Sequence, residues 1–509
     1  MNKKKVQIAI LILLMAWYGL FFMEKIDLTT SDLGRHIKNG EMILSGQFEV
    51  LNTNFYSYTE PDYPFVNHHW GGGVIFYLIS KVFGFIGLSI LCLLISLITF
   101  FLFFKIAQKE SNFKITFLVS LVLISLMASR NEIRPEIFSY FFIALFFWIL
   151  WHWRKGKLDS KYLFILPVLG VFWVNIHIYF IFGPALIGLF LVDWIIRKKE
   201  INKKISIVLI LTGLVSLLNP FFIKGLIYPF NIFKSYGYRI VENQSVWFLE
   251  NWGFNSPNLR LFEISLVILI ASFVLLLIRN RKRFSFIYFT LTIVFSFLGL
   301  LAIRNFALFG FFALIIIVYN LRHSRIKIKK IPLSLIVFLS LTIFLTSLFV
   351  NYQKLPLQEY RFGFGLMESN NKSIDFFKEH NLQGVIFNNY DIGGYLIHHL
   401  FPEKKVFTDN RPEAYSISHF QDVYIPAQTN NIIWQEQNEI YDFNIIYFSH
   451  RDYTNWGQQF LIERIKDNNW AVVYYDPFAI IFLKRNDINK LIIDKYEIPK
   501  EIFGIKKNE

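Results

Sequence analysis

The sequence of 509 residues has few charged residues and almost no cysteine. Only 17% of its residues are charged, whereas 54% are hydrophobic and 58 are phenylalanine. This charge is too little to cover the surface of a soluble protein of that size, which excludes an ordinary soluble globular fold. The only cysteine, Cys92, lies within an apolar run. An intrachain disulfide and a cysteine metal site are therefore both excluded.

Long apolar runs fill much of the chain from Val6 to Val350, and the remainder has ordinary polarity. A helix satisfies its backbone hydrogen bonds internally, so apolar runs of about 17–25 residues predict membrane-spanning helices. We predict about eleven such helices. No small-residue cleavage site follows the first run, so we interpret it as an uncleaved span. The predicted spans are residues 6–23, 85–107, 115–129, 136–153, 162–175, 177–196, 205–222, 262–278, 284–303, 305–321 and 332–350.

Basic residues gather in alternate short loops between these runs. Six segments together hold 24 basic and three acidic residues: 3–5, 105–114, 154–161, 197–204, 279–283 and 322–330. The rest of the chain holds 28 basic and 34 acidic residues, so the net charge of +15 comes from these loops. Basic loops stay in the cytoplasm. The charge therefore predicts no nucleic-acid partner but a multi-pass plasma membrane protein, with a cytoplasmic N-terminus and an extracytoplasmic C-terminal domain.

The pattern predicts two domains. Residues 1–350 form the transmembrane domain, which includes a long first extracytoplasmic loop, 24–84, and a second outer loop, 223–261. Residues 351–509 form a soluble extracytoplasmic α/β domain. Its predicted helices are 373–380 and 393–400, and its predicted strands are 384–387, 406–408, 445–448, 471–475 and 480–483.

The first outer loop carries the polar residues most suited to chemistry. Asp32 and His36 are four residues apart on a predicted helix and share one face. A structural interpretation is that Asp32 only caps this helix. Farther on, His68 and His69 precede Trp70, which suits a polar pocket with an aromatic wall. With Asp32 they could ligate a divalent metal, but adjacent histidines cannot easily reach one ion, so we predict no metal site.

Several arginines fall at the outer ends of predicted spans, where they could bind a phosphate. The guanidinium group matches phosphate oxygens with two parallel hydrogen bonds, which favours arginine for this role. These arginines are Arg130, Arg134, Arg239 and Arg304. Each arginine could instead have a purely structural role. Arg134, for example, could anchor the chain at the membrane interface just before a helix that begins at Pro135. Likewise, His177 could be a satisfied bundle histidine, and Glu242 could pair with Arg239.

The order of several short motifs resembles that of a known family. It is similar to the bacterial polytopic glycosyltransferases of the C superfold, which are related to the protein O-mannosyltransferases and the lipid A aminoarabinose transferases. The likeness extends over most of the chain. The matching residues are Asp32, His36 and Gly40, residues 55–59, residues 67–70, Arg130 with Arg134 and Pro135, residues 173–177, Asn219 with Pro220, Arg304 with Asn305, residues 388–396 and residues 408–411.

This resemblance implies an α-helical polytopic membrane protein that transfers a sugar with inversion from a polyprenyl-phosphate carrier. The acceptor would be a hydroxyl of a glycan, lipid or protein outside the membrane, and no cofactor is expected. Asp32 takes the place of the first-loop aspartate at the reaction centre, where a carboxylate can accept the hydroxyl proton. Where the family often has a glutamate, this chain has His69, so only Glu60 and Asp62 could supply a second carboxylate nearby. The predicted substrate-binding residues are His36, His68, His69, Arg130, Arg134, His177, Arg239, Glu242 and Arg304.

Three other functions remain open from the sequence. Buried arginines and histidines also line the paths of lipid and solute transporters, although the chain has no repeat symmetry. A polysaccharide polymerase or ligase would use a diphosphate-linked donor instead. Finally, the C-terminal domain could serve only to bind a partner.

Overall fold

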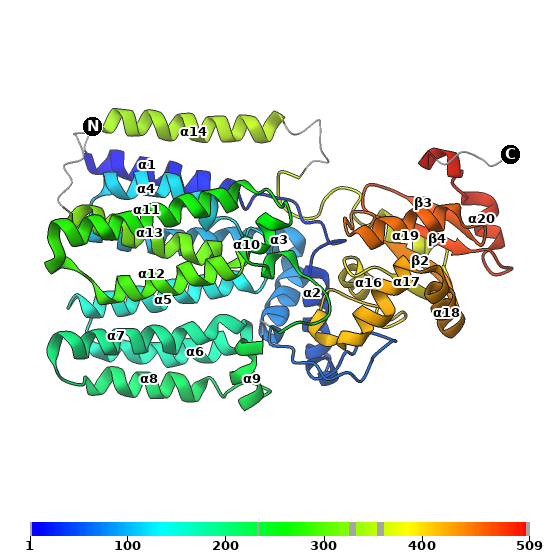
Figure 1. Cartoon of the computed structure of the whole chain (residues 1–509), viewed down its shortest axis with the longest axis horizontal. Helices are drawn as coiled ribbons and strands as arrows, with labels where there is room; N and C mark the ends of the chain where they lie inside the picture. The colour runs from blue at the N-terminus through cyan, green and yellow to red at the C-terminus, as the bar shows by residue number, and fades with distance from the viewer. Residues whose placement is uncertain (1–2, 232–233, 325–331, 354–360, 505–509) are drawn as a thin grey trace. The chain divides into compact units, whose positions relative to one another are not determined.

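The computed structural model describes residues 3–231, 234–324, 332–353 and 361–504, and their contacts divide the chain into two compact units (Figure 1). The helical unit comprises residues 1–24, 86–233 and 239–364. The mixed unit comprises residues 25–85, 234–238 and 365–509. The sequence assigned the first outer loop to the transmembrane domain, whereas the contacts group this loop with the C-terminal residues.

In the helical unit, a helix occupies the position of each predicted span. The long helices are α1 (Lys3–Leu20), α3 (Trp70–Glu110, from residue 86 onward), α4 (Phe113–Met127), α5 (Glu136–Arg154), α6 (Ile165–Ile176), α7 (Phe182–Lys198), α8 (Lys203–Val215), α11 (Pro257–Asn280), α12 (Phe286–Leu301), α13 (Phe306–His323) and α14 (Leu333–Gln353). Two short helices, α9 (Ile223–Ile227) and α10 (Val246–Asn251), lie in the second loop. Residues 325–330 of the last basic segment lie outside the described residues.

Length and composition show which helices can cross a membrane. Among the described residues, five apolar segments are long enough: Trp70–Glu110, Glu136–Arg154, Ile178–Lys198, Pro257–Arg283 and Ile303–His323. Four shorter apolar helices accompany them. The chain is therefore a helical membrane protein, and the count of eleven spans stays a prediction.

The long helix α3 belongs to both units because it bends at Gly84. This residue has a φ of 63°, a left-handed conformation that glycine adopts without a steric penalty. The bend therefore ends the part of α3 that packs in the mixed unit and starts the span that was predicted to begin at residue 85.

Helix α13 is the core of the helical unit. It is apolar on all sides and buried from Phe306 to Val318, as expected of a helix surrounded by others. Helices α4, α11 and α12 pack directly against it. In its middle, Phe312 stacks on Phe295 with ring centroids 4.3 Å apart, and Phe311 stacks on Phe103 at 4.8 Å. Aromatic packing thus explains much of the high phenylalanine content.

The mixed unit contains a four-stranded sheet in the order β1-β2-β4-β3. Strands β1 and β2 are parallel, and the other neighbours are antiparallel. The strands are β1 (Val385–Asn388), β2 (Phe443–Phe448), β3 (Trp470–Tyr475) and β4 (Ile480–Lys484). The helices are α2 (Leu33–Leu44), α15 (Lys372–Glu379), α16 (Gly393–Leu400), α17 (Ile425–Thr429), α18 (Asn431–Tyr441), α19 (Asn455–Lys466) and α20 (Lys490–Tyr496).

These elements confirm the predicted helices and four of the five predicted strands in the C-terminal domain. The predicted strand 406–408 is wrong. Val406 instead forms an isolated bridge with Ser57 of the first outer loop. Its apolar run therefore reflects burial under that loop rather than a place in the sheet.

The first outer loop packs into the core of the mixed unit. Phe65 joins a buried cluster with Phe387 and Phe407, and the Tyr58 hydroxyl donates a hydrogen bond of 2.7 Å to the carbonyl of Ile386. Helix α2 packs on α16. The Ser416 hydroxyl donates to Glu60 at 2.6 Å, which gives this carboxylate a structural task.

A fully buried ion pair also holds the first outer loop in the mixed unit. Arg411 contacts Asp409 at 2.6 Å and also donates to the side-chain oxygen of Asn54 at 2.7 Å. Both charged side chains are almost completely inaccessible. Each charge therefore depends on its partner, because a single buried charge is costly.

Replacing Arg411 with methionine should lower the free energy of unfolding of the mixed unit by about 3–5 kcal/mol, because Asp409 would remain buried without its cation. Hydrogen exchange of peptides from β1 and β2 measures this loss. The control is Lys466→Met in the exposed pair with Glu463, which should change it by less than about 0.5 kcal/mol. Equal effects of the two changes would contradict the structural role of the buried pair.

Candidate functional site

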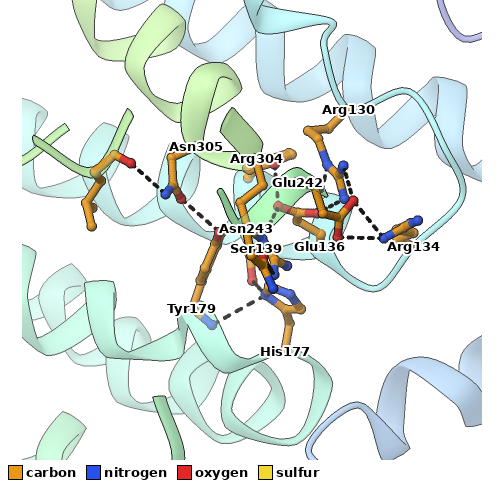
Figure 2. Close-up of polar contacts among 12 residues, drawn as sticks. Arg130, Arg134, Glu136, Ser139, His177, Tyr179, Glu242, Asn243, Arg304 and Asn305 are labelled. Carbon is orange, nitrogen blue, oxygen red and sulfur yellow. Dashed lines mark hydrogen bonds and ion pairs between the residues drawn. The ribbon is translucent and has the colours of Figure 1, made fainter. Parts of the chain in front are cut away.

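Three arginines and two glutamates meet at one end of the helical unit (Figure 2). We call Arg130, Arg134, Glu136, Glu242 and Arg304 the arginine cluster. The first two lie between α4 and α5, Glu136 begins α5, Glu242 lies in the second loop, and Arg304 lies between α12 and α13. Segments far apart in the sequence thus bring five charged groups to one place.

Glu136 holds one side of the cluster. Its Oε2 accepts hydrogen bonds from Nε and Nη2 of Arg130 at 3.2 and 3.1 Å, and its Oε1 accepts from the Tyr140 hydroxyl at 2.8 Å. The side chain is only 3% exposed. As the first residue of α5, it also lies where the helix dipole favours a negative charge. Arg130 is therefore fixed in orientation by a two-point contact.

Glu242 links two arginines. It accepts from Arg130 at 2.6 Å and from Arg134 at 2.9 Å. Burial alone would raise the pKa of Glu242, but Arg134 and Arg130 outweigh it and hold the pKa well below its usual range. Glu242 is therefore ionised and orders the second loop against α5.

The cluster contains more positive than negative charge. Three guanidinium groups face Glu136, which is 3% exposed, and Glu242, which is 20% exposed. A further carboxylate, Glu132, contacts Arg134 at 2.7 Å but is 58% exposed, so solvent weakens its effect on the charge of the cluster. Arg304 is the least neutralised cation: its Nε lies 3.9 Å from Glu136, beyond hydrogen-bond distance. One Nη donates to Asn243 at 2.9 Å, and the buried Nε has no hydrogen-bond partner among the described residues. Such a group suits an additional anion.

A cavity of about 160 Å³ opens beside Arg130 and Arg304. Polar side chains from the ends of α4 and α11, namely Ser129, Ser256 and Asn258, line the same cavity. Apolar side chains such as Leu259 and Phe306 complete the wall. A cavity of this volume is large enough for several water molecules, and its cations and hydroxyls suit one small anionic group.

A buried polar chain supports α5 next to the cluster. Trp173 donates to the Ser139 hydroxyl at 2.8 Å. Ser139 lies 2.8 Å from Nδ1 of His177 (Figure 2). The Tyr179 amide also donates to this nitrogen, at 3.4 Å. Two donors on Nδ1 place the imidazole proton on Nε2. His177 thus lies among satisfied polar groups, 1% exposed, in agreement with its structural interpretation.

Asp32 lies in the mixed unit at the start of α2. It occupies the N-cap position, but its side chain makes no capping hydrogen bond. One of its oxygens lies 3.8 Å from the Arg35 guanidinium, and the side chain is 20% exposed. A capping role therefore does not explain this carboxylate.

The three first-loop histidines form an aromatic group in the mixed unit. The rings of His36 and His69 have centroids 5.4 Å apart, and those of His68 and His69 are 3.8 Å apart. His36 also packs edge-on against Phe76. In the part of the chain that the structure describes, no group of three His, Cys, Asp or Glu side chains has the arrangement of a metal site.

Comparisons with known proteins find a similar fold among the solved structures. No family model and no curated protein matches the chain. Among solved structures, the archaeal oligosaccharyltransferase AglB from Archaeoglobus fulgidus, in complex with an inhibitory peptide and a dolichol-phosphate, matches with a TM-score of 0.56 and 11% identity. The match covers 98% of this chain and 75% of AglB. The chain therefore shares its fold with this oligosaccharyltransferase. The resemblance seen in the sequence is confirmed at the level of the fold.

In this fold, the predicted site residues fall into three groups. Arg130, Arg134, Glu242 and Arg304 come together in the arginine cluster, with His177 near it. Asp32 and the three histidines lie in the mixed unit. Arg239 joins neither group, since it is exposed and its guanidinium lies over the ring of Phe248, 5.5 Å from the centroid.

Sequence reasoning missed Glu136 and Asp391. Asp391 follows Asn389 and Tyr390 in the turn before α16. Burial raises the pKa of Asp391 to about 7, and the charges of Asp452 and Asp32 add to the effect. Asp452 is held by hydrogen bonds from Asn389 at 3.1 Å and from Thr454 at 2.6 Å. Asp391 could have been proposed from the sequence because it lies in a short polar turn before two glycines.

The raised pKa of Asp391 predicts a pH-dependent stability. The folded protein binds this proton more tightly than the unfolded chain, so the stabilisation is complete below pH about 4 and is lost as the pH rises through about 7. Asp391→Asn should remove this dependence and make the protein more stable than wild type at pH 8. Thermal unfolding from pH 4 to pH 8 measures it, with the exposed Asp422→Asn as the control. Parallel curves for wild type and Asp391→Asn would contradict the assignment.

Proposed function

We propose that the chain is a membrane glycosyltransferase that transfers a sugar from a polyprenyl-phosphate carrier to a hydroxyl acceptor outside the membrane. The observation that carries this proposal is the surplus positive charge of the arginine cluster, beside a cavity lined by Arg130 and Arg304. The superfold supports it, since AglB is an oligosaccharyltransferase whose structure contains a dolichol-phosphate and a peptide. The dolichol-phosphate has the chemistry of the proposed carrier, a polyprenyl phosphate.

The arginine cluster would bind the carrier phosphate. Glu136 and Glu242 fix Arg130 and Arg134, whereas Arg304 has donors left for a ligand. When the bond between the sugar and the phosphate breaks, negative charge grows on the phosphate oxygen. Cations already oriented toward that oxygen stabilise the transition state without reorganisation, and more strongly in a water-poor cavity than in water.

Asp32 would act as the general base. The acceptor oxygen attacks the anomeric carbon from the face opposite the phosphate, the bond from carbon to phosphate oxygen breaks, and the hydroxyl proton moves to the Asp32 carboxylate. The configuration at the anomeric carbon is therefore inverted. A charged carboxylate suits this role because a sugar hydroxyl is a weak nucleophile at neutral pH.

Transfer can be tested with the full chain in lipid nanodiscs. Radiolabelled decaprenyl-phosphate hexoses are supplied with membrane extract as the acceptor source, and the release of decaprenyl phosphate is measured. Release that needs both protein and extract supports the proposal. Movement of intact donor across a vesicle membrane without release would indicate a transporter, and consumption of a diphosphate-linked donor alone would indicate a polymerase or ligase.

The proposal also fixes an orientation, with the basic loops in the cytoplasm and the mixed unit outside the plasma membrane. Cysteine labelling should show it, because the only native cysteine is buried. In intact cells, a membrane-impermeant maleimide should label Tyr453→Cys, whose native side chain is 86% exposed. Glu200→Cys, in a basic loop, should react only after permeabilisation. The reverse pattern would contradict the orientation.

A further inference from the structure

Helix α5 begins at the arginine cluster and ends, about 28 Å away, among lysine and tryptophan side chains. Three ammonium groups gather there around the ring of Trp151. They belong to Lys109, Lys155 and Lys157 and lie 5.7, 5.3 and 5.7 Å from the ring centroid. Lys109 also lies over the ring of Trp148, 4.9 Å from its centroid. We call these three lysines and two tryptophans the lysine–tryptophan site.

The backbone after α5 returns Lys157 to the end of the helix. Lys155 is the C-cap residue, and Gly156 follows with a φ of 68°, a left-handed conformation that favours glycine. The amide of Lys157 then donates to the carbonyl of His152 at 2.9 Å, and the amide of Gly156 donates to that of Trp153 at 2.9 Å. These two hydrogen bonds define a Schellman motif, which fixes Lys157 beside the last turn of α5.

The buried carboxylate of Glu110 holds Trp151 in place. It accepts a hydrogen bond of 2.5 Å from the indole Nε1 of Trp151 and one of 2.7 Å from the Tyr288 hydroxyl. It also pairs with Lys155 at 2.8 Å, and its side chain is only 3% exposed. Glu110 therefore neutralises one of the three lysines and fixes the ring around which they gather.

Lys109 and Lys157 keep their positive charge without such a partner. Neither forms an ion pair with a carboxylate in the part of the chain that the structure describes. The Nζ of Lys109 lies 2.8 Å from Nε2 of His152, whose Nδ1 lies 2.8 Å from the carbonyl oxygen of Trp148. A carbonyl oxygen only accepts, so the imidazole proton lies on Nδ1 and Nε2 accepts from the ammonium group. His152 is therefore neutral, and the site has three positive charges and one negative charge.

The helix dipoles explain only part of this arrangement. The C-terminus of a helix favours a nearby cation, which explains Lys109 in the last turn of α3 and Lys155 at the end of α5. Lys157 lies beyond α5, and the dipoles do not require three ammonium groups around one indole. Like charges this close repel one another, and an anion bound between them would remove the repulsion.

We propose that the lysine–tryptophan site binds the headgroup of phosphatidylglycerol, an anionic phospholipid of the membrane. The phosphodiester oxygens accept hydrogen bonds from ammonium groups and balance the surplus charge. Tryptophan favours the level of the headgroups, where an apolar ring and a polar edge both find partners. In the proposed orientation this end of α5 faces the cytoplasm, and the negative surface of that leaflet attracts lysines. This phospholipid is separate from the sugar carrier, whose phosphate the arginine cluster would bind at the other end of α5.

The experiment uses the full chain in phosphatidylcholine nanodiscs that contain a phosphatidylglycerol with a diazirine on its glycerol headgroup. Irradiation should label the peptide 148–157. Excess phosphatidylglycerol should compete, whereas excess phosphatidylcholine and inorganic phosphate should not. The double change Lys109→Gln and Lys157→Gln should reduce labelling about tenfold or more, because each lysine near a lipid surface contributes about fivefold to binding. Both lysines are exposed, so the fold should be kept, and thermal unfolding checks this.

The matched control is Lys198→Gln. Lys198 lies in the last turn of α7 over a single tryptophan, Trp194, with Nζ 6.0 Å from the ring centroid. This change removes one basic charge and one contact with an aromatic ring, but it leaves the lysine–tryptophan site intact. Labelling of the peptide 148–157 should therefore stay within about twofold of wild type.

Three results would overturn the inference. Labelling that the double change leaves intact would show that these lysines do not hold the headgroup. An equal loss in Lys198→Gln would show that the general basic charge of this end attracts the lipid. Competition by inorganic phosphate as strong as that by phosphatidylglycerol would assign the site to a soluble anion. Sugar transfer is not measured, so each of these results leaves the proposed function to its own test.

Discussion

Asp32→Asn should lower the rate of sugar transfer about 10²–10⁴-fold, the usual contribution of a general base. The carboxylate is removed but the size and shape of the side chain are kept. The Asp32 side chain makes no capping hydrogen bond, so α2 should form in the variant. The loss should therefore appear in kcat, while the binding of decaprenyl phosphate stays unchanged.

Two measurements make this result specific to the base. Glu49→Gln, at an exposed position of the same loop, should transfer at the wild-type rate. Asp32→Asn should also remove a negative charge that raises the pKa of Asp391, so the pH midpoint of the stability profile should fall. Wild-type turnover together with such a shifted midpoint would show that Asp32 is a neighbour of Asp391 and not the base.

Hydropathy predicted the helices of the helical unit well because each apolar run is a local property of the sequence. Where it failed, a local turn explains the difference. The span predicted to end at residue 222 corresponds to α8, which ends at Val215, because Asn219 and Pro220 form a turn there: the Asn219 side chain accepts from the Phe221 amide at 2.9 Å. Apolar composition alone does not show such an end.

The arginine cluster was predictable in part. Arginines at the ends of apolar spans indicated a phosphate site, and the structure brings three of the four together. Glu136 was missed because it directly follows Pro135, and the two residues together could be interpreted simply as the start of a helix. Placing an ionisable residue at the edge of a membrane span costs free energy, so such a residue usually has a partner of opposite charge. This rule could have indicated Glu136 from the sequence. The exposed position of Arg239 could not be predicted, because its stacking on Phe248 depends on the conformation of the second loop.

The place of the first outer loop could not be predicted from the sequence. Its contacts join residues more than 300 positions apart, such as Tyr58 with Ile386 and Arg411 with Asn54. The polar and aromatic side chains of this loop follow no periodic pattern, so the sequence does not indicate which other segment they pack against. The same burial hid the role of Asp391, whose pKa depends on neighbours from two other segments.

Arg304→Gln should lower sugar transfer about 10²–10³-fold, the usual loss when one donor to a developing oxyanion is removed. The fold should be kept, since Glu136 retains its two hydrogen bonds from Arg130 and that from Tyr140. Arg304→Lys should recover only part of the rate, because an ammonium group cannot make two parallel hydrogen bonds to a phosphate.

Arg134→Gln should have a smaller effect than Arg304→Gln. The guanidinium group of Arg134 already pairs with Glu242 and Glu132, so it has less capacity to bind a phosphate. In the variant, Glu242 would keep Arg130 as its partner. Arg260→Gln is the control, since this residue is 63% exposed and pairs with Glu250 and Glu263 at the surface. The measurements are turnover of a decaprenyl-phosphate hexose and equilibrium binding of decaprenyl phosphate. If Arg304→Gln and Arg260→Gln bind and turn over alike, the surplus charge of the cluster does not serve the carrier phosphate, and the cluster only ties the second loop to α5.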